Sequence, residues 1–208
     1  ARQDATIVRA PAAPPAVLRL GARGAFQRSN FAVACAAAEA WLGRLDDAAV
    51  RAAAASTVVP GRFEVLADEA GVEVVLDGAH NAGGIAALAT SLPDFVASRP
   101  LVAVLSVLDD KDAAAMLSTL LPLCAGVVFT ANNNPRALSP ATLASLAGQI
   151  GAPEVALVEP DPHRAVALAR ALAGELGNGD GAVVLATGSI YLVADLVRPP
   201  GAGRGSTL

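Results

Sequence analysis

The sequence predicts an α/β fold: a Rossmann-like, mostly parallel sheet with helices on both faces, an antiparallel edge hairpin and a preceding helical segment. Three observations predict it. Short apolar runs alternate with helix-forming segments from residue 61 onward, which is the pattern of consecutive βαβ units. These runs are almost continuously apolar, as expected for parallel strands that are buried on both faces. The chain before residue 61 instead contains long alanine-rich stretches, which favour helix.

The chain before residue 57 predicts a helical region. Ser29 or Asn30 is a suitable N-cap for a helix that runs to about residue 42. Apolar residues recur in it at three-to-four spacing, which predicts one buried face made by Phe31, Ala34, Cys35, Ala38, Trp41 and Leu42. Asp46 begins a second helix that runs to about residue 55. Short strands are expected on either side of a proline-rich stretch, at residues 5–9 and 16–20.

Strands and helices alternate beyond a linker at residues 56–60. Two strands, at residues 62–67 and 72–77, flank a turn at residues 68–71, so the first becomes an antiparallel edge. Further strands are predicted at residues 101–107, 126–130, 155–158 and 182–186. Helices are predicted at residues 83–92, 112–121, 140–149, 162–176 and 189–197. Residues 199–208 are rich in proline and glycine and predict a flexible tail.

The composition excludes several classes of protein. Hydrophobic residues make up 54% of the chain and charged residues 16%, which excludes a disordered chain. The net charge of −4 gives no basic footprint for nucleic acid, and no apolar run is long enough for a membrane span. Cys35 and Cys124 lack the spacing of a metal or redox pair. They are interpreted as buried apolar side chains, which fits a reducing, cytoplasmic location.

The most informative stretch is Asp77-Gly78-Ala79-His80-Asn81, between a predicted strand and a predicted helix. Ligands of open parallel sheets bind at the carboxyl ends of the strands. Asp77 could accept a hydrogen bond from a ribose hydroxyl, while His80 and the first N–H groups of the helix could face a phosphate. Alternatively, Asp77 and Asn81 cap the helix. The residues alone leave both interpretations open.

Arg62, directly after Pro60-Gly61, stands where a hinge between domains is expected. Its guanidinium could bind phosphate oxygens and offset charge that develops during phosphoryl transfer. Alternatively, it is a surface arginine paired with Glu64 or Glu73.

Three more polar residues follow other predicted strands. Lys111, within Asp109-Asp110-Lys111-Asp112, could hold a carboxylate or phosphate, or could be neutralised by the flanking aspartates. Arg136 follows the next strand and could bind a carboxylate. Ser189 begins the last helix, where N–H groups could bind an anion or the serine could simply cap.

In their order and intervals these stretches resemble the C-terminal part of folylpolyglutamate synthase/dihydrofolate synthase, a family of the Mur ligase superfamily. The resemblance runs from about residue 20 to residue 196. It is carried by Gly24-Ala25-Phe26-Gln27-Arg28-Ser29-Asn30, Gly61-Arg62-Phe63-Glu64, the Asp77–Asn81 stretch, Asp109-Asp110-Lys111-Asp112, Asn134-Pro135-Arg136 and Gly188-Ser189-Ile190-Tyr191.

The resemblance implies an ATP-dependent ligase that adds L-glutamate to folate or dihydropteroate through an acyl phosphate, with Mg²⁺ as cofactor. It implies that Asn30 holds adenine, although Phe26 stands at the family's histidine position. It further implies phosphate contacts and catalytic roles for Arg62 and His80, and a nucleotide contact for Asp77. The substrate-binding residues expected by location are Lys111, Arg136 and Ser189; no metal ligand is expected.

Lys111 is the only lysine, beside fourteen arginines, so the chain cannot contain a Gly-x-x-x-x-Gly-Lys-[Ser/Thr] phosphate loop. We therefore expect residues 1–57 to be the end of a central ATPase domain plus a linker, residues 58–198 to form the C-terminal Mur-ligase domain, and residues 199–208 to be the tail. The chain alone should be inactive, with ATP and Mg²⁺ bound mainly by the missing domain and the full-length enzyme a monomer. The alternatives are a peptidoglycan-type Mur ligase domain and a non-catalytic nucleotide- or anion-binding module.

Overall fold

The computed structural model describes residues 7–14, 18–66 and 72–199. The chain divides into two compact units, a helical unit at Ala1–Pro60 and an α/β unit at Gly61–Leu208. The predicted hairpin turn and nearly all of the predicted tail lie outside the described residues, as do parts of the two N-terminal strands. The described parts of those strands, residues 7–9 and 18–20, are not in a strand, so the prediction is wrong there.

The helical unit contains α1 (Ala25–Leu42) and α2 (Asp47–Ser56). The prediction that Ser29 or Asn30 caps α1 is wrong, because the helix begins after Gly24, without a side-chain cap. Ser29 Oγ instead donates to the Ala12 carbonyl at 2.7 Å. The second prediction is confirmed, since the Asp46 side chain accepts a hydrogen bond from the Ala49 N–H at 2.9 Å and caps α2.

The helices of this unit bury little of their apolar surface. Only Gln27 and Ala32 are buried among the described residues of α1, and Trp41, placed on the predicted buried face, is 88% exposed. Between α1 and α2 lies a cavity of about 510 Å³. Its lining is mostly apolar and includes Leu20, Phe31, Ala34, Cys35, Ala38 and Val50. The predicted face therefore lines an open hollow rather than a closed core.

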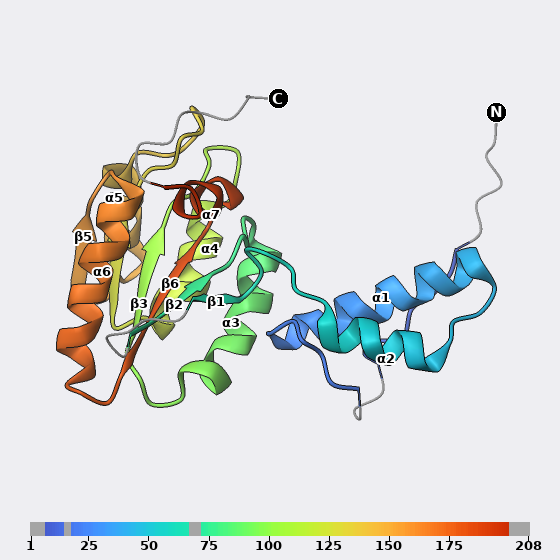
Figure 1. Cartoon of the computed structure of the whole chain (residues 1–208). Coiled ribbons are helices and arrows are strands. Elements are labelled where there is room, and N and C mark those ends of the chain that lie inside the picture. The colour runs from blue at the N-terminus through green and yellow to red at the C-terminus, as the bar shows by residue number, and fades with distance from the viewer. Residues whose placement is uncertain (1–6, 15–17, 67–71, 200–208) are drawn as a thin grey trace, which may run out of the picture. The chain divides into compact units, whose positions relative to one another are not determined.

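The α/β unit contains a six-stranded sheet in the order β1-β2-β6-β3-β4-β5 (Figure 1). Every pairing is parallel except that of β1 with β2, which confirms the predicted fold class and its antiparallel edge. The strands are β1 (Glu64–Leu66), β2 (Val72–Leu76), β3 (Leu101–Leu105), β4 (Gly126–Phe129), β5 (Val155–Val158) and β6 (Ala182–Thr187).

Helices follow the strands and cover the sheet (Figure 1). They are α3 (Ala82–Val96), α4 (Ala113–Leu120), the 3₁₀ turn η1 (Leu121–Leu123), α5 (Pro140–Ile150), α6 (Pro162–Gly177) and α7 (Ile190–Leu196). Side chains of Asn81, Asp112, Ser139, Asp161 and Ser189 cap the N-termini of these α-helices. The core on one face joins β2, β6 and β3 to α6 and α7, while α3, α4 and α5 pack in succession on the other.

Candidate functional site

The carboxyl ends of β2, β6, β3 and β4 meet at one edge of the sheet because these strands are parallel. Hydrogen bonds join the loops that follow them. The Gly188 N–H, after β6, donates to the Ala79 carbonyl, after β2, at 3.0 Å. The Asp109 N–H, after β3, donates to the Arg136 carbonyl, after β4, at 2.8 Å. The predicted site residues of the α/β unit therefore lie along one continuous edge.

Asp77 is a buried carboxylate, only 2% exposed, directly after β2. Its Oδ2 accepts a hydrogen bond from the Phe63 N–H and its Oδ1 one from the Ala79 N–H, both at 2.8 Å. Burial raises the pKa of Asp77, and the two backbone hydrogen bonds and nearby Arg62 oppose that rise. Asp77 thus fastens β1 to the loop after β2. It does not cap α3, and a ribose contact stays a prediction.

Arg62 reaches this loop through an unusual turn. Gly61 has a φ of 66° and Phe63 one of 49°, a left-handed conformation that is rare for a bulky residue. The Gly78 N–H donates to the Gly61 carbonyl at 2.8 Å. A Cβ on residue 78 would collide with Arg62 Nη1 and displace it, so Gly78 leaves room for the guanidinium in this position. The turn thus holds the guanidinium against the loop after β2.

Phe63 anchors that turn by packing against Phe95. Its ring is buried and meets the Phe95 ring edge to face, with centroids 5.2 Å apart and an interplanar angle of 88°. Such aromatic pairs contribute about 0.5–1.5 kcal/mol beyond their buried area. The anchor offsets part of the backbone strain at residue 63.

His80 is half-buried in the same loop. Its Nδ1 lies 2.9 Å from the Gly78 carbonyl oxygen. A carbonyl only accepts, so Nδ1 carries a proton, and in the neutral ring Nε2 is then an acceptor. The neighbouring Asn81 accepts from the Gly84 N–H at 2.8 Å and caps α3, so the capping interpretation of Asn81 is confirmed. Gly78 therefore contacts both predicted catalytic side chains, Arg62 and His80.

Two predicted substrate-binding residues converge on one carboxylate oxygen. Asp110 Oδ2 lies 3.0 Å from Lys111 Nζ and 3.2 Å from Arg136 Nη1. The hydrogen bond from Lys111 is the main cause that lowers the pKa of Asp110, and the charge of Arg136 adds to it. All three side chains are partly exposed. The arrangement shows two cations placed so that they can share one carboxylate.

Ser189 is only 1% exposed, and its Oγ accepts a hydrogen bond from the Tyr191 N–H at 3.2 Å. Capping of α7 is thus what the structure shows, and a substrate contact stays a prediction. Gly188, which has a φ of 94°, precedes it. A Cβ there would lie 2.6 Å from the Ser106 carbonyl oxygen, so only glycine allows β6 and β3 to end this close together.

Asn30 belongs to the helical unit. Its Nδ2 donates to Gln27 Oε1 at 2.9 Å, and both amides line the apolar cavity. Gln27 Nε2 is buried and has no partner among the described residues. The pair therefore offers hydrogen-bonding atoms inside a hollow that is otherwise apolar.

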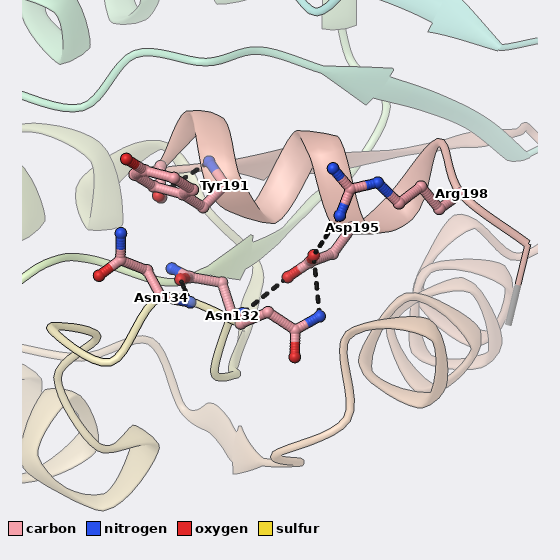
Figure 2. Close-up of polar contacts among 7 residues, drawn as sticks. Asn132, Asn134, Tyr191, Asp195 and Arg198 are labelled. Carbon is pink, nitrogen blue, oxygen red and sulfur yellow. Dashed lines mark hydrogen bonds and ion pairs between the residues drawn. The ribbon is translucent and has the colours of Figure 1, made fainter. Parts of the chain in front are cut away.

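The sequence interpretation missed a polar network around Asp195, shown in Figure 2. Asp195 is 7% exposed. Its Oδ2 accepts from the Asn133 N–H at 2.8 Å and its Oδ1 from Asn133 Nδ2 at 2.9 Å. The available signals were a single acidic residue in the apolar stretch of α7 and the asparagine run after β4.

The described residues contain no group of three or more His, Cys, Asp or Glu side chains placed to hold a metal ion. No helix within those residues is long and apolar enough to cross a membrane.

Residues 61–190 match the family described as "Mur ligase, glutamate ligase domain". The chain is 41% identical over 136 residues to the dihydrofolate synthase/folylpolyglutamate synthase of Mycobacterium tuberculosis, which covers 63% of this chain and 28% of that protein. The chain therefore spans less than a third of the length of that relative.

Two solved structures are similar to the chain. Mycobacterium tuberculosis folylpolyglutamate synthase complexed with ADP matches with a TM-score of 0.79 and 35% identity, over 88% of this chain and 42% of that one. E. coli FolC in complex with DHPP and ADP matches with a TM-score of 0.70 and 26% identity, over 81% of this chain and 38% of that one.

Proposed function

Because the chain belongs to the Mur ligase family through its glutamate ligase domain, we propose that it is the C-terminal part of an ATP-dependent ligase. The ligase would join L-glutamate to a folate or to dihydropteroate. The names of the relatives, and the ADP and DHPP bound in solved structures, support this substrate class. We further propose that residues 1–57 are the end of a central ATPase domain and that residues 58–198 are the glutamate ligase domain.

The observation that carries the proposal is that two sets of cationic side chains lie along one edge of the sheet. Arg62 lies against Gly78 at the carboxyl end of β2, and Lys111 and Arg136 share the Asp110 carboxylate beyond β3 and β4. In the reaction, an acceptor carboxylate takes the terminal phosphoryl group of ATP and releases ADP. The glutamate amine then attacks the acyl carbon, loses a proton and releases phosphate. Both steps depend on positioning and charge stabilisation.

We assign the phosphate side of the reaction to Arg62 and His80. The Arg62 guanidinium can bind phosphate oxygens in a fork and offset charge that develops on them. His80 donates Nδ1–H to the Gly78 carbonyl, so its Nε2 can donate to a phosphate oxygen only when the ring is an imidazolium. We assign His80 the role of a phosphate clamp in the imidazolium form. We assign it no role as a general base, because the acyl phosphate already activates the acceptor and the reaction depends on positioning and charge stabilisation.

We assign the glutamate side to Lys111 and Arg136. An amino-acid carboxylate could replace Asp110 as the partner of both cations, because the three side chains are already in ion-pair geometry. Mg²⁺ belongs to the proposal through the ligase chemistry alone. We propose that it is bound mainly by the ATPase domain together with the phosphates of ATP.

The test is Arg62→Ala in the full-length enzyme. We expect turnover to fall roughly a hundredfold, the cost of removing one group that stabilises developing charge, while the melting temperature changes little. Arg164→Ala is the matched control, because Arg164 is an exposed arginine on α6. Near-normal turnover in Arg62→Ala would remove Arg62 from the mechanism.

A second measurement tests the division of labour between domains. ATP-dependent incorporation of labelled glutamate, with dihydropteroate and folate supplied in turn, should be absent for this chain and present for the full-length protein. The reason is that Lys111 is the only lysine and no phosphate loop contains it. Incorporation by the chain alone would contradict the proposal.

A further inference from the structure

Helix α7 contacts the loops on both sides of the candidate site. Near its middle, Val193 lies against Gly61, where a Cβ on residue 61 would stand 2.8 Å from Val193 Cγ1. Near its end, Asp195 accepts two hydrogen bonds from Asn133 in the loop after β4. Figure 2 shows Asp195 between Arg198 and the loop that carries Asn132 and Asn134. This short helix therefore braces both the Arg62 turn and the asparagine loop.

Further hydrogen bonds follow the contact with Asn133 along the same loop and end at Arg136. The Asn134 N–H donates to Asn132 Oδ1, and the Arg136 N–H donates to Asn134 Oδ1, both at 2.9 Å. Asn132 Nδ2 donates to Ser106 Oγ at 2.9 Å. The loop folds on its own side chains. It is tied to Ser106 directly after β3, to Asp109 through the Arg136 carbonyl, and to α7 through Asn133.

Of these ties, the one to α7 uses a charged group. Asp195 is buried and meets both N–H groups of one residue, the backbone and the side-chain amide of Asn133. Hydrogen bonds to a buried charge are stronger than those between neutral groups, so Asp195 holds the exposed Asn133 more firmly than a neutral acceptor would. Arg198 lies farther away, at 3.8 Å, and is partly exposed, so its ion pair contributes little.

We infer that Asp195 is a positioning residue for Arg136: it fixes the loop of residues 131–136 so that the guanidinium faces Asp110 and Lys111. The inference rests on the proposed function, in which Arg136 and Lys111 bind the glutamate carboxylate. Asp195 itself touches neither cation. Its effect on the reaction should therefore appear in glutamate binding and not in nucleotide binding.

The first test is amide hydrogen exchange on this chain. In Asp195→Ala, the amides of Asn133, Asn134 and Arg136 should exchange on the order of tenfold faster. The amides of Phe63 and Ala79, held by Asp77, should not change. Asp94→Ala is the matched control, because Asp94 is exposed on α3. Unchanged exchange at all three loop amides would overturn the inference without reference to any activity.

The second test is steady-state kinetics of the full-length enzyme. Asp195→Ala should raise the KM for L-glutamate roughly tenfold and leave the KM for ATP within about twofold. Asp195→Asn, which keeps one acceptor oxygen, should lie between Asp195→Ala and the parent. Arg136→Ala distinguishes failure of the proposed carboxylate site from failure of the positioning role. If it leaves the glutamate KM unchanged, the proposed carboxylate site fails. If it raises the KM but Asp195→Ala does not, the positioning role fails.

Discussion

The helical unit and the α/β unit use similar apolar side chains with different results. Helix α1 has 18 residues, of which only Gln27 and Ala32 are buried, whereas all five residues of β3 are buried. A sheet with helices on both faces supplies two layers of partners to each strand. Within the described residues of the helical unit, α1 and α2 have as partners only each other and irregular chain such as residues 18–22. An apolar stripe on a helix thus predicts which face can be buried, but a second layer of packing partners determines whether that face is buried.

Polar atoms show the same contrast. In the α/β unit, the buried carboxylates of Asp77 and Asp195 each accept two N–H groups. In the helical unit, Gln27 Nε2 is buried without a partner among the described residues, at the wall of a 510 Å³ cavity. An unsatisfied buried amide costs about 1–3 kcal/mol. The α/β unit also has a buried polar atom without a partner among its described residues, Thr187 Oγ1, so the contrast lies in its two satisfied buried carboxylates.

The largest expected effect comes from separating the two units. A chain that begins at residue 56 should unfold in one cooperative transition, because its core lies entirely in the α/β unit. Residues 1–60 alone should show no cooperative transition, because they bury little apolar surface. Thermal melting followed by circular dichroism measures both. Loss of the transition on removing residues 1–55 would break the comparison.

The reactivities of Cys35 and Cys124 compare the interiors of the two units. Burial raises the pKa of Cys124 to about 12, and Cys124 is buried while Cys35 is only half-buried beside the cavity. The thiolate is the reactive form, so Cys124 should be alkylated roughly a hundredfold more slowly than Cys35 at neutral pH. Mass spectrometry after timed iodoacetamide treatment measures the rates. The two rates should converge in denaturant, and equal rates in the folded chain would contradict the prediction.

A matched pair of leucine truncations comes next in size. Leu185→Ala removes a fully buried side chain from β6 and should lower the free energy of unfolding by about 2–5 kcal/mol. Leu42→Ala, at a side chain 66% exposed at the end of α1, should change it by less than about 0.5 kcal/mol. Urea denaturation measures both. A large effect at Leu42 would show that α1 has partners beyond its own unit.

The smallest expected effect is the pH dependence contributed by Asp77. Its pKa is raised by burial, so between the ordinary value near 4 and the raised value the folded state binds more proton than the unfolded state. The free energy of unfolding therefore falls as pH rises through that window, and the decrease is absent in Asp77→Ala. Urea denaturation of both chains from about pH 4 to 7 measures the difference. A rise with pH would show that the hydrogen bonds to Asp77 outweigh its burial.

Most of the α/β fold could be predicted because local signals and tertiary structure agree there. The strand at residues 155–158 coincides with β5, and the helix predicted from residue 140 begins at Pro140, the start of α5. The start of α1 could not be predicted in this way. Ser29 and Asn30 are good caps, but the preceding Ala25–Arg28 segment forms helix equally well. The helix propensity of Ala25–Arg28 therefore outweighs the capping preference of Ser29 and Asn30.

The candidate site was predictable only as a set of strand ends. The sequence places Arg62, His80, Lys111 and Arg136 next to strands, and parallel pairing then brings those strand ends to one edge. It does not reveal that Asp110 bridges two cations, because that depends on how the loop after β4 folds. Asp195 was missed for a related reason. One acid in an apolar helix predicts a solvent-facing residue, whereas the structure turns it towards Asn133.

The position of β6 also bears on how the protein is made. Strand β6 is the last in the described chain but lies between β2 and β3 in the sheet. While the ribosome is still adding it, β2 and β3 each have an unpaired edge, and such edges invite pairing with other chains. The nascent sheet therefore remains two unpaired parts, β1-β2 and β3-β4-β5, until β6 emerges, and during that interval its open edges are most exposed to aggregation.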